Sequence, residues 1–175
     1  MIDRSIKLET KRLVLRATTP ADAQRLAEIQ SNWNVTRMLR LATWPVDQVA
    51  FTAWIASHEP EWHEGSAYRF AVELNGHVIG QCDVDDLIGD QGEIGYWYDE
   101  AHWGRGYAVE AAAALLDFAR TRLKLHQLHA GHDAENPNSG KVLERLGFKH
   151  HGDTTKFSKP YGAERAYRTY RFTPR

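Results

Sequence analysis

The segment from Glu93 to Arg120 constrains the fold of this chain more than any other part of the sequence. It opens with an aromatic and apolar run, Glu93–Tyr98, which is typical of a β-strand in a covered sheet. A loop containing Gly104 and Gly106 follows. From Tyr107 to about Thr121 the chain is rich in Ala and Leu and has no Gly or Pro, which predicts a helix. The segment therefore predicts a strand, a glycine loop and a helix in that order.

This order directs backbone N–H groups at an anion, because the first turn of a helix has donors without partners and the positive end of the helix dipole. Glycines let the loop fold tightly and let a phosphate approach the main chain. The loop Trp103–Ala108, which reads WGRGYA, is therefore predicted to form a phosphate cradle. It lacks the Gly-Lys-Ser/Thr end of a P-loop and the G-x-G-x-x-G pattern of a dinucleotide fold. An ordinary turn between a strand and a helix would show the same two glycines.

The composition narrows the class of partner and the compartment. The 175 residues carry a formal net charge of −1, which does not favour a nucleic-acid or anionic membrane surface. The length fits a single domain, residues 1–175, without a linker or repeat. The one cysteine, Cys82, excludes an internal disulfide framework, and we expect a buried strand residue there rather than a nucleophile. The sequence shows no apolar export signal and no run of about 18 apolar residues, so a cytoplasmic protein is expected.

The periodicity along the chain predicts an α/β fold with a mixed sheet. Asn75-Gly76, between two alternating segments, is the strongest hairpin signal of the sequence. The strands before and after the glycine loop need a helical crossover, so we expect them to be parallel. The predicted strands are 8–16, 68–74, 77–84, 93–98, 126–132, 148–157 and 164–172, and the predicted helices are 20–30, 46–58, 107–121 and 138–145.

Four motifs, in this order, resemble one protein family. They are the opening LETKRLVLR, then EIGYW, WGRGYA and NPNSGKVLERLGF. With the order of elements, they are similar to the GNAT N-acetyltransferases and more narrowly to the RimJ/RimL-like branch, which acetylates protein N-termini, polyamines, antibiotics and other small amines. The glycine loop resembles the acetyl-CoA pyrophosphate loop, written (Gln or Arg)-x-x-Gly-x-(Gly or Ala). Gly106 and Ala108 match its last two positions, whereas Trp103 replaces the usual Gln or Arg.

The resemblance implies a GNAT-like mixed, mostly antiparallel sheet with a splayed parallel strand pair and flanking helices. Acetyl-CoA would be the co-substrate, with its pantetheine arm along Tyr96, Trp97 and Tyr98 and the N–H of Tyr98 stabilising the oxyanion. Core packing is the alternative role of the two tyrosines. The resemblance also allows a homodimer. The residues expected to hold the pyrophosphate are Trp103, Gly104, Arg105, Gly106, Tyr107 and Ala108.

An amine acceptor needs a base, because its ammonium form predominates at neutral pH. Glu93 is the first candidate, since it begins the central strand, where histone acetyltransferases of this fold carry a glutamate base. Asp83 and Asp85, on the neighbouring strand, are alternative bases or recognise a cationic acceptor. A purely solvent-facing role is the alternative for all three carboxylates.

The leaving thiolate needs a proton, and many family members supply it from a tyrosine where this chain has Leu143. Ser139 resembles the serine proposed for this role in the RimJ/RimL-like branch, and a capping role at the start of a helix fits it equally. Asn136 and Asn138 are expected to bind the pantetheine amides, with loop and cap chemistry as the alternative.

Aromatic and histidine side chains complete the set of candidates. Trp33 and Trp44 lie in irregular sequence, in the region that usually closes over the acceptor, and are predicted to form part of a substrate wall. His126, His129 and His132 are not expected to bind a metal, because successive residues of a strand point to opposite faces, which turns His129 away from the other two.

The sequence therefore predicts an acetyl-CoA-dependent N-acetyltransferase that acts by direct attack of a primary amine. The acceptor is either a protein N-terminus, for which an open groove is expected, or a small amine such as a polyamine, for which an acidic pocket around Asp83, Asp85 and Glu93 is expected. The alternative is a non-catalytic acyl-CoA-binding sensor or scaffold. The missing tyrosine at Leu143 favours this alternative, and the presence of Glu93 and Ser139 opposes it.

Overall fold

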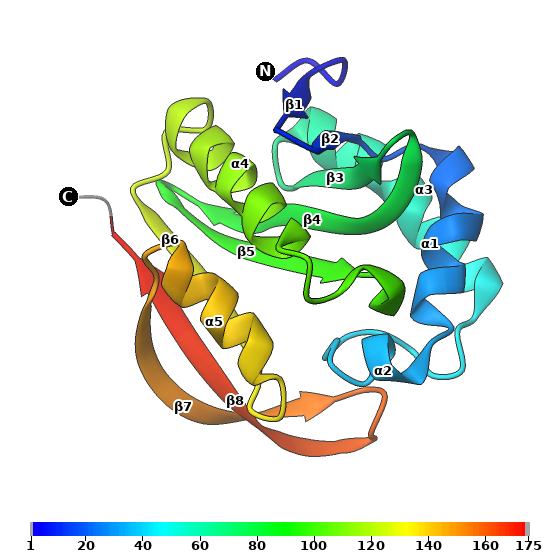
Figure 1. The fold of residues 1–175 in the computed structure, drawn as a ribbon, viewed down its shortest axis with the longest axis vertical. Coiled ribbons are helices and arrows are strands. Elements are labelled where there is room, and N and C mark those ends of the chain that lie inside the picture. Colours follow the sequence, from blue (N-terminus) through cyan, green and yellow to red (C-terminus); the bar gives the residue numbers. More distant parts are fainter. Residues whose placement is uncertain (1, 174–175) are drawn as a thin grey trace.

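The computed structural model describes residues 2–173 and contains one eight-stranded sheet with helices on both faces (Figure 1). The strand order is β1-β2-β3-β4-β5-β6-β8-β7. The strands are β1 (Lys7–Glu9), β2 (Leu13–Ala17), β3 (Tyr68–Leu74), β4 (His77–Ile88), β5 (Gln91–Tyr98), β6 (Gln127–Asp133), β7 (Lys149–Ser158) and β8 (Ala163–Phe172). The helices are α1 (Ala23–Gln30), α2 (Trp33–Thr36), α3 (Gln48–Glu64), α4 (Tyr107–Thr121) and α5 (Pro137–Arg145), with short 3-10 turns η1 (Pro20–Asp22) and η2 (Glu100–His102).

Strands β5 and β6 form the parallel pair that the sequence predicted, and every other pairing in the sheet is antiparallel. Their pairing covers three positions, from Gln91 opposite Gln127 to Glu93 opposite His129. Beyond Glu93 the two strands are no longer paired, although both continue, to Tyr98 and Asp133 respectively. The mixed, mostly antiparallel sheet with a splayed parallel pair is therefore confirmed. The unpaired ends of these strands face one another across what we call the slot.

Two hydrophobic cores cover the two faces of the sheet. The larger core includes Ile94 and Tyr98 of β5 and the buried stripe Ala111 and Leu115 of α4. The smaller core consists of side chains from α1, α2 and α3, with Trp97 packed against it. Because successive residues of a strand point to opposite faces, the side chains of the neighbours Trp97 and Tyr98 pack against different cores. Helices α4 and α5 thus lie on one face and helices α1 and α3 on the other.

The structure corrects three predicted boundaries. Residues 8–16 are not one strand, because Thr10 turns the chain: its N–H and side chain bind Leu13, which separates antiparallel β1 and β2. Helix α3 extends to Glu64, past the predicted end at residue 58. Pro60 lies inside it and removes one backbone donor, but the helix continues beyond it. Strand β4 continues to Ile88 through a register shift after Asp85, so the polar turn is shorter than expected.

Within residues 2–173, no helix is both long and apolar enough to cross a lipid bilayer.

Candidate active site

The glycine loop between β5 and α4 has the backbone geometry of an anion cradle. Gly104 has φ +73° and Gly106, the N-cap of α4, has φ +80°, a left-handed conformation that glycine adopts without steric cost. Among residues 2–173, we find no partner for the N–H groups of residues 104–109, and the first bonded amide of the helix is that of Glu110, which donates to Gly106 O at 3.1 Å. Free amides and the positive end of the α4 dipole therefore converge at this loop.

Trp103 anchors the cradle to the end of the central strand. Its indole Nε1–H donates to Tyr98 O at 2.9 Å, and the ring remains 45% exposed. The side chain that replaces the usual Gln or Arg therefore binds the protein main chain. This hydrogen bond holds the start of the cradle against the end of β5.

The main chain of β5 presents hydrogen-bonding groups to the slot. Asp99 N–H donates to Ile79 O at 2.8 Å, which directs the amide of Asp99 toward β4. Because amides of a strand alternate in direction, the N–H groups of Tyr98 and Tyr96 point the other way, toward β6. Strand β6 does not pair with β5 at these positions. The arrangement suits an extended ligand that pairs with β5 as an added strand.

The side chains of this strand divide between the two faces. Tyr98 is buried in the larger core, burial raises the pKa of its phenol, and its hydroxyl has no hydrogen-bond partner within residues 2–173. Trp97 is half-buried on the opposite face, against the smaller core. The packing role expected for at least one tyrosine thus applies to the side chain of Tyr98, whereas its amide faces the slot.

Tyr96 crosses the end of the slot and binds helix α5. Its hydroxyl lies 2.9 Å from Ser139 Oγ and donates to Ser139 O at 3.0 Å. Burial raises the pKa of Tyr96 to about 12, so the phenol keeps its proton at neutral pH. Leu143, at the position where a tyrosine was expected, is buried in the larger core. Two hydroxyl groups from different elements therefore meet on the α5 side of the slot.

The first turn of α5 is held by Asn136, its N-cap. The Asn136 side chain accepts from Ser139 N at 3.3 Å, which is the cap chemistry weighed against cofactor binding. Ser139 lies in the first turn, so its hydroxyl remains free to bind Tyr96. Asn138 is exposed on the same turn and makes no side-chain hydrogen bond to another described residue.

On the face of the sheet covered by α1 and α3, Arg69 of β3 forms ion pairs with three carboxylates. Its guanidinium binds Glu61 at 2.7 Å, Asp83 at 3.2 Å and Asp85 at 3.0 Å. Asp83 is buried, also accepts from Gln81, and its Oδ1 would lie 2.6 Å from a Cβ at Gly95. The side chain of Asp85 is more accessible, 31% exposed against 10% for Asp83.

Glu93 belongs to this carboxylate face, because it lies directly opposite Asp85 on β4 and opposite His129 on β6. The ring of Tyr167 lies over Gly131 of β6, where a Cβ would be 2.3 Å from its Cε1. Burial, and then the charge of Glu93, raise the pKa of Tyr167.

Burial, and then the charge of Asp83, raise the pKa of Asp85 to about 7. Glu93 and the pair Tyr96–Ser139 lie on opposite faces, because residues 93 and 96 are an odd number of positions apart.

An aromatic wall formed by Trp33, Trp44 and Tyr161 lies at the tip of the β7–β8 hairpin. The ring of Trp33 is 5.1 Å from that of Trp44 and 5.2 Å from that of Tyr161. Lys159 N also donates to Arg40 O at 2.9 Å, which joins the hairpin to the segment after α2. Trp44 is 42% exposed. The two tryptophans singled out in the sequence are therefore together, with a tyrosine that the sequence did not single out.

Comparison with known proteins decides the family. The acetyltransferase (GNAT) domain model matches residues 12–149, which include the cradle, the slot and Ser139. The chain belongs to the GNAT acetyltransferases. The chain is also 33% identical over 159 residues to the uncharacterized N-acetyltransferase p20 of Bacillus licheniformis, covering 89% of each sequence.

Solved structures of GNAT fold resemble the whole chain. One is RimL, a ribosomal L7/L12 alpha-N-protein acetyltransferase in complex with coenzyme A, with a TM-score of 0.85, 18% identity and coverage of 96% of this chain and 98% of that one. Another is Mycobacterium smegmatis RimJ in complex with a CoA disulfide, with a TM-score of 0.84, 24% identity and coverage of 97% and 88%. At these identities the likeness shows the fold.

Contacts near the cradle that sequence reasoning missed join the segment before it to helices α1 and α2. Glu100 of η2 accepts from Asn32 Nδ2 at 2.6 Å and from Asn34 Nδ2 at 3.0 Å, which joins the start of α2 to the segment before the cradle. Arg25 of α1 forms an ion pair with Asp99, the residue before Glu100. These residues lie more than 60 positions apart in sequence, so no local pattern indicates that they meet.

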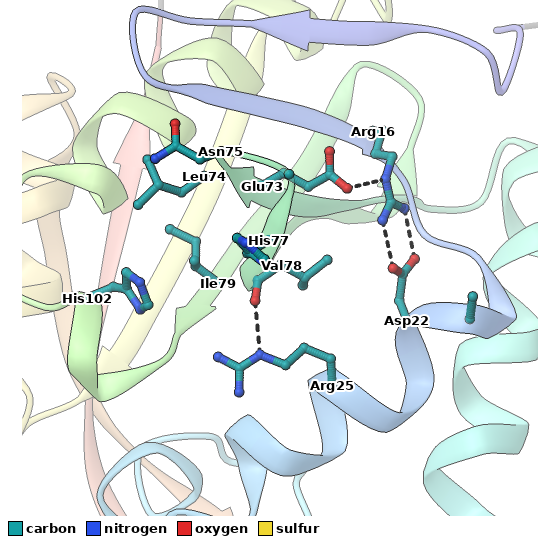
Figure 2. Close-up of a pocket in the computed structure, with 12 residues that line it drawn as sticks. Arg16, Asp22, Arg25, Glu73, Leu74, Asn75, His77, Val78, Ile79 and His102 are labelled. Atoms are coloured by element: carbon teal, nitrogen blue, oxygen red, sulfur yellow. Dashed lines mark hydrogen bonds and ion pairs between the residues drawn. The ribbon is translucent and has the colours of Figure 1, made fainter.

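A cavity of about 650 Å³ lies beside the β3–β4 hairpin, and Figure 2 shows the residues that line it. One of them, His102, directly precedes the cradle in the chain. Arg16 there pairs with Asp22 at 2.7 Å and with Glu73 at 2.8 Å, and Arg25 Nε donates to Val78 O at 3.1 Å. The cations of this cavity are thus already bound to protein groups. None of the residues predicted for the site lines it.

Residues 2–173 contain no group of three or more His, Cys, Asp or Glu side chains placed to hold a metal ion. His132 is buried, with its Nδ1 2.7 Å from Asp133 O, whereas His126 is exposed.

Proposed function

We propose that this GNAT protein transfers the acetyl group of acetyl-CoA to a primary amine by direct attack. The observation that carries this proposal is the slot between β5 and β6, with the Tyr98 amide facing it and the free amides of residues 104–109 nearby. The cradle would hold the pyrophosphate, and the pantetheine arm would pair with the Tyr96 and Tyr98 main chain. The thioester would then lie where the Tyr98 N–H stabilises the oxyanion.

Glu93 would take a proton from the ammonium of the acceptor, which leaves a neutral amine able to attack. Its position on the face of α1 and α3, opposite Asp85 and near Tyr167, supports entry of the acceptor from that face. Once Glu93 holds the first proton, the neutral amine attacks and a C–N bond forms. As the tetrahedral intermediate collapses, the C–S bond breaks, CoA leaves as a thiolate, and the nitrogen releases its second proton to water. Asp83 and Asp85 would attract the cationic amine, and Arg69 would hold both carboxylates in place.

Ser139 would return a proton to the departing CoA thiolate from the opposite face. The 2.9 Å contact with the Tyr96 hydroxyl supports this role, because the phenol can replace the proton that the serine gives. A thiol with a pKa near ~8.5 is already a fair leaving group, so a weak acid is sufficient here.

A protein N-terminus is the acceptor class we favour. The aromatic wall of Trp33, Trp44 and Tyr161 supports it, since such a wall offers apolar contact to side chains beyond the amine. The RimL neighbour is a ribosomal L7/L12 alpha-N-protein acetyltransferase in complex with coenzyme A, and the RimJ neighbour is in complex with a CoA disulfide. A polyamine is the second candidate, favoured by the carboxylates around Arg69.

The test is thiol release from acetyl-CoA with short peptides that have free N-termini and with polyamines, for the wild type and Glu93→Gln. We expect amine-dependent release that falls at least tenfold in Glu93→Gln with acetyl-CoA affinity unchanged, which is within the range of general-base effects. Glu164→Gln, an exposed carboxylate of β8, is the matched control and should retain wild-type release.

Two outcomes would contradict parts of the proposal. Tight acetyl-CoA binding without release for either class of amine would favour a sensor or scaffold. Absence of acetyl-CoA binding would exclude a pyrophosphate-binding role for the loop Trp103–Ala108.

A further inference from the structure

Arg12 reaches the cradle from the turn between β1 and β2. Its Nε donates to Glu110 Oε2 at 2.7 Å, and its Nη1 donates to Arg105 O at 3.0 Å. The guanidinium carbon lies 4.4 Å from the centre of the Tyr107 ring. One side chain thus contacts the loop, the first residue of α4 and the first turn of that helix.

The bond to Arg105 O fixes the direction of the peptide between Arg105 and Gly106. Because a trans peptide is planar, its C=O and N–H point in opposite directions. With the carbonyl turned toward Arg12, the Gly106 N–H is turned away from it, and this amide has no partner among residues 2–173. Glycine permits the reversed peptide as well, since its φ is free in sign. A reversed peptide would present an oxygen atom to the ligand, and Arg12 opposes that reversal.

Arg12 also controls the charge at the start of α4. Glu110 accepts from Thr10 Oγ1 at 2.6 Å and from Arg12 N at 2.8 Å, in addition to the guanidinium bond. Burial opposes ionisation of Glu110, but the bonds from Thr10 and Arg12 outweigh it and hold its pKa below the ordinary value. Without Arg12, an uncompensated carboxylate would lie one helical turn from a site for phosphate.

We propose that Arg12 is a positioning residue for the pyrophosphate of acetyl-CoA, which orients the Gly106 amide and neutralises Glu110. In this chain it takes over the support that the usual Gln or Arg of the loop motif would give, because Trp103 binds Tyr98 O instead. The inference rests on the proposed use of acetyl-CoA. It adds a residue that lies about 90 positions before the loop and outside the loop motif.

The test is calorimetric binding of CoA and of dephospho-CoA, which lacks the 3′-phosphate, to the wild type, Arg12→Ala and Lys11→Ala. No acceptor or turnover is needed. We expect Arg12→Ala to weaken both ligands equally, by about tenfold, as loss of a charge-assisted hydrogen bond does. Lys11→Ala removes the same charge from the same exposed turn and should bind both ligands as the wild type does.

Arg12→Lys keeps the charge but cannot bind Glu110 and Arg105 O as a fork, so we expect an intermediate loss of about threefold. This variant keeps the test decisive if Arg12→Ala does not fold. The melting temperature of each variant separates loss of fold from loss of affinity.

Unchanged affinity in both Arg12 variants would overturn the inference, as would a loss confined to CoA, which would place Arg12 at the 3′-phosphate. A wild type that binds neither ligand would overturn the proposed function itself, and the two failures are therefore distinguishable.

Discussion

The hydroxyl groups of Tyr96 and Ser139 lie 2.9 Å apart and join β5 to the first turn of α5 across the slot. The two residues are 43 positions apart in the chain, so packing of α5 over β6 brings them together. The contact places a second proton donor behind the serine, in a fold where the tyrosine of the usual position is replaced by buried Leu143.

Tyr96→Phe should therefore lower the rate of acetyl transfer without changing the KM for acetyl-CoA. We expect a decrease in kcat of about five- to tenfold, because the serine loses the group that reprotonates it. Steady-state thiol release measures both parameters. Tyr68→Phe, which removes a hydroxyl from the core away from the slot, is the control, and an equal loss in both variants would contradict the proton relay.

Asp85 should make acceptor binding depend on pH. Its pKa of about 7 means that the carboxylate is mostly protonated at pH 6 and mostly ionised at pH 8. If the ionised form attracts the ammonium group, the KM for a polyamine acceptor, whose ammonium groups stay protonated over this range, should be several-fold lower at pH 8 than at pH 6. In Asp85→Asn the KM should be high and nearly constant over this range. A wild-type profile that persists in Asp85→Asn would assign the titration to another group.

His58 should reduce stability at acidic pH. It is buried, binds Thr18 Oγ1 through Nδ1 at 2.8 Å, and burial, with the charges of Arg69 and Arg4, lowers its pKa to about 3. The folded His58 therefore stays neutral, whereas the unfolded chain binds a proton below its ordinary pKa of 6.5. Stability is present above pH 6.5 and is lost as pH falls toward 3, by about 2 kcal/mol between pH 7 and pH 5.

Urea unfolding of the wild type and His58→Gln at both pH values tests this prediction. The glutamine can keep a hydrogen bond to Thr18 but does not titrate, so the difference in unfolding free energy between the two proteins should change with pH. Parallel pH profiles would show that His58 does not control the acid limb.

Tyr161→Ala should weaken acceptor binding selectively. Tyr161 contacts Trp33 edge-on, with ring centres 5.2 Å apart, and neither residue belongs to the cradle. Loss of one aromatic pair corresponds to about 1 kcal/mol, so we expect a KM for a peptide acceptor about fivefold higher and an unchanged KM for acetyl-CoA. Phe157→Ala, at a 50% exposed site on β7, is the control. Equal changes in both KM values would contradict a wall specific to the acceptor.

The sequence alone was enough to predict the parts of the molecule that local geometry controls. The alternation around Asn75-Gly76, the aromatic strand ending at Tyr98, the glycine loop and the Ala-rich helix after Gly106 all have short-range signals. The parallel pairing of β5 with β6 followed from the helix between them, because a crossover of that length returns the chain in the same direction. The family resemblance followed from these motifs in order.

Only the tertiary structure decided which side chains meet. Arg12 and Glu110 are 98 residues apart, and Trp33 meets Tyr161 only because the β7–β8 hairpin packs beside α2. The turn at Thr10, which splits a predicted strand, brings Arg12 to the cradle. The physical reason is that a strand has two faces and a shift of one residue exchanges them, so the partners of a side chain depend on register and packing between distant elements. The sequence alone indicated the glycine loop of the cradle, whereas only the fold showed that Arg12 contacts it.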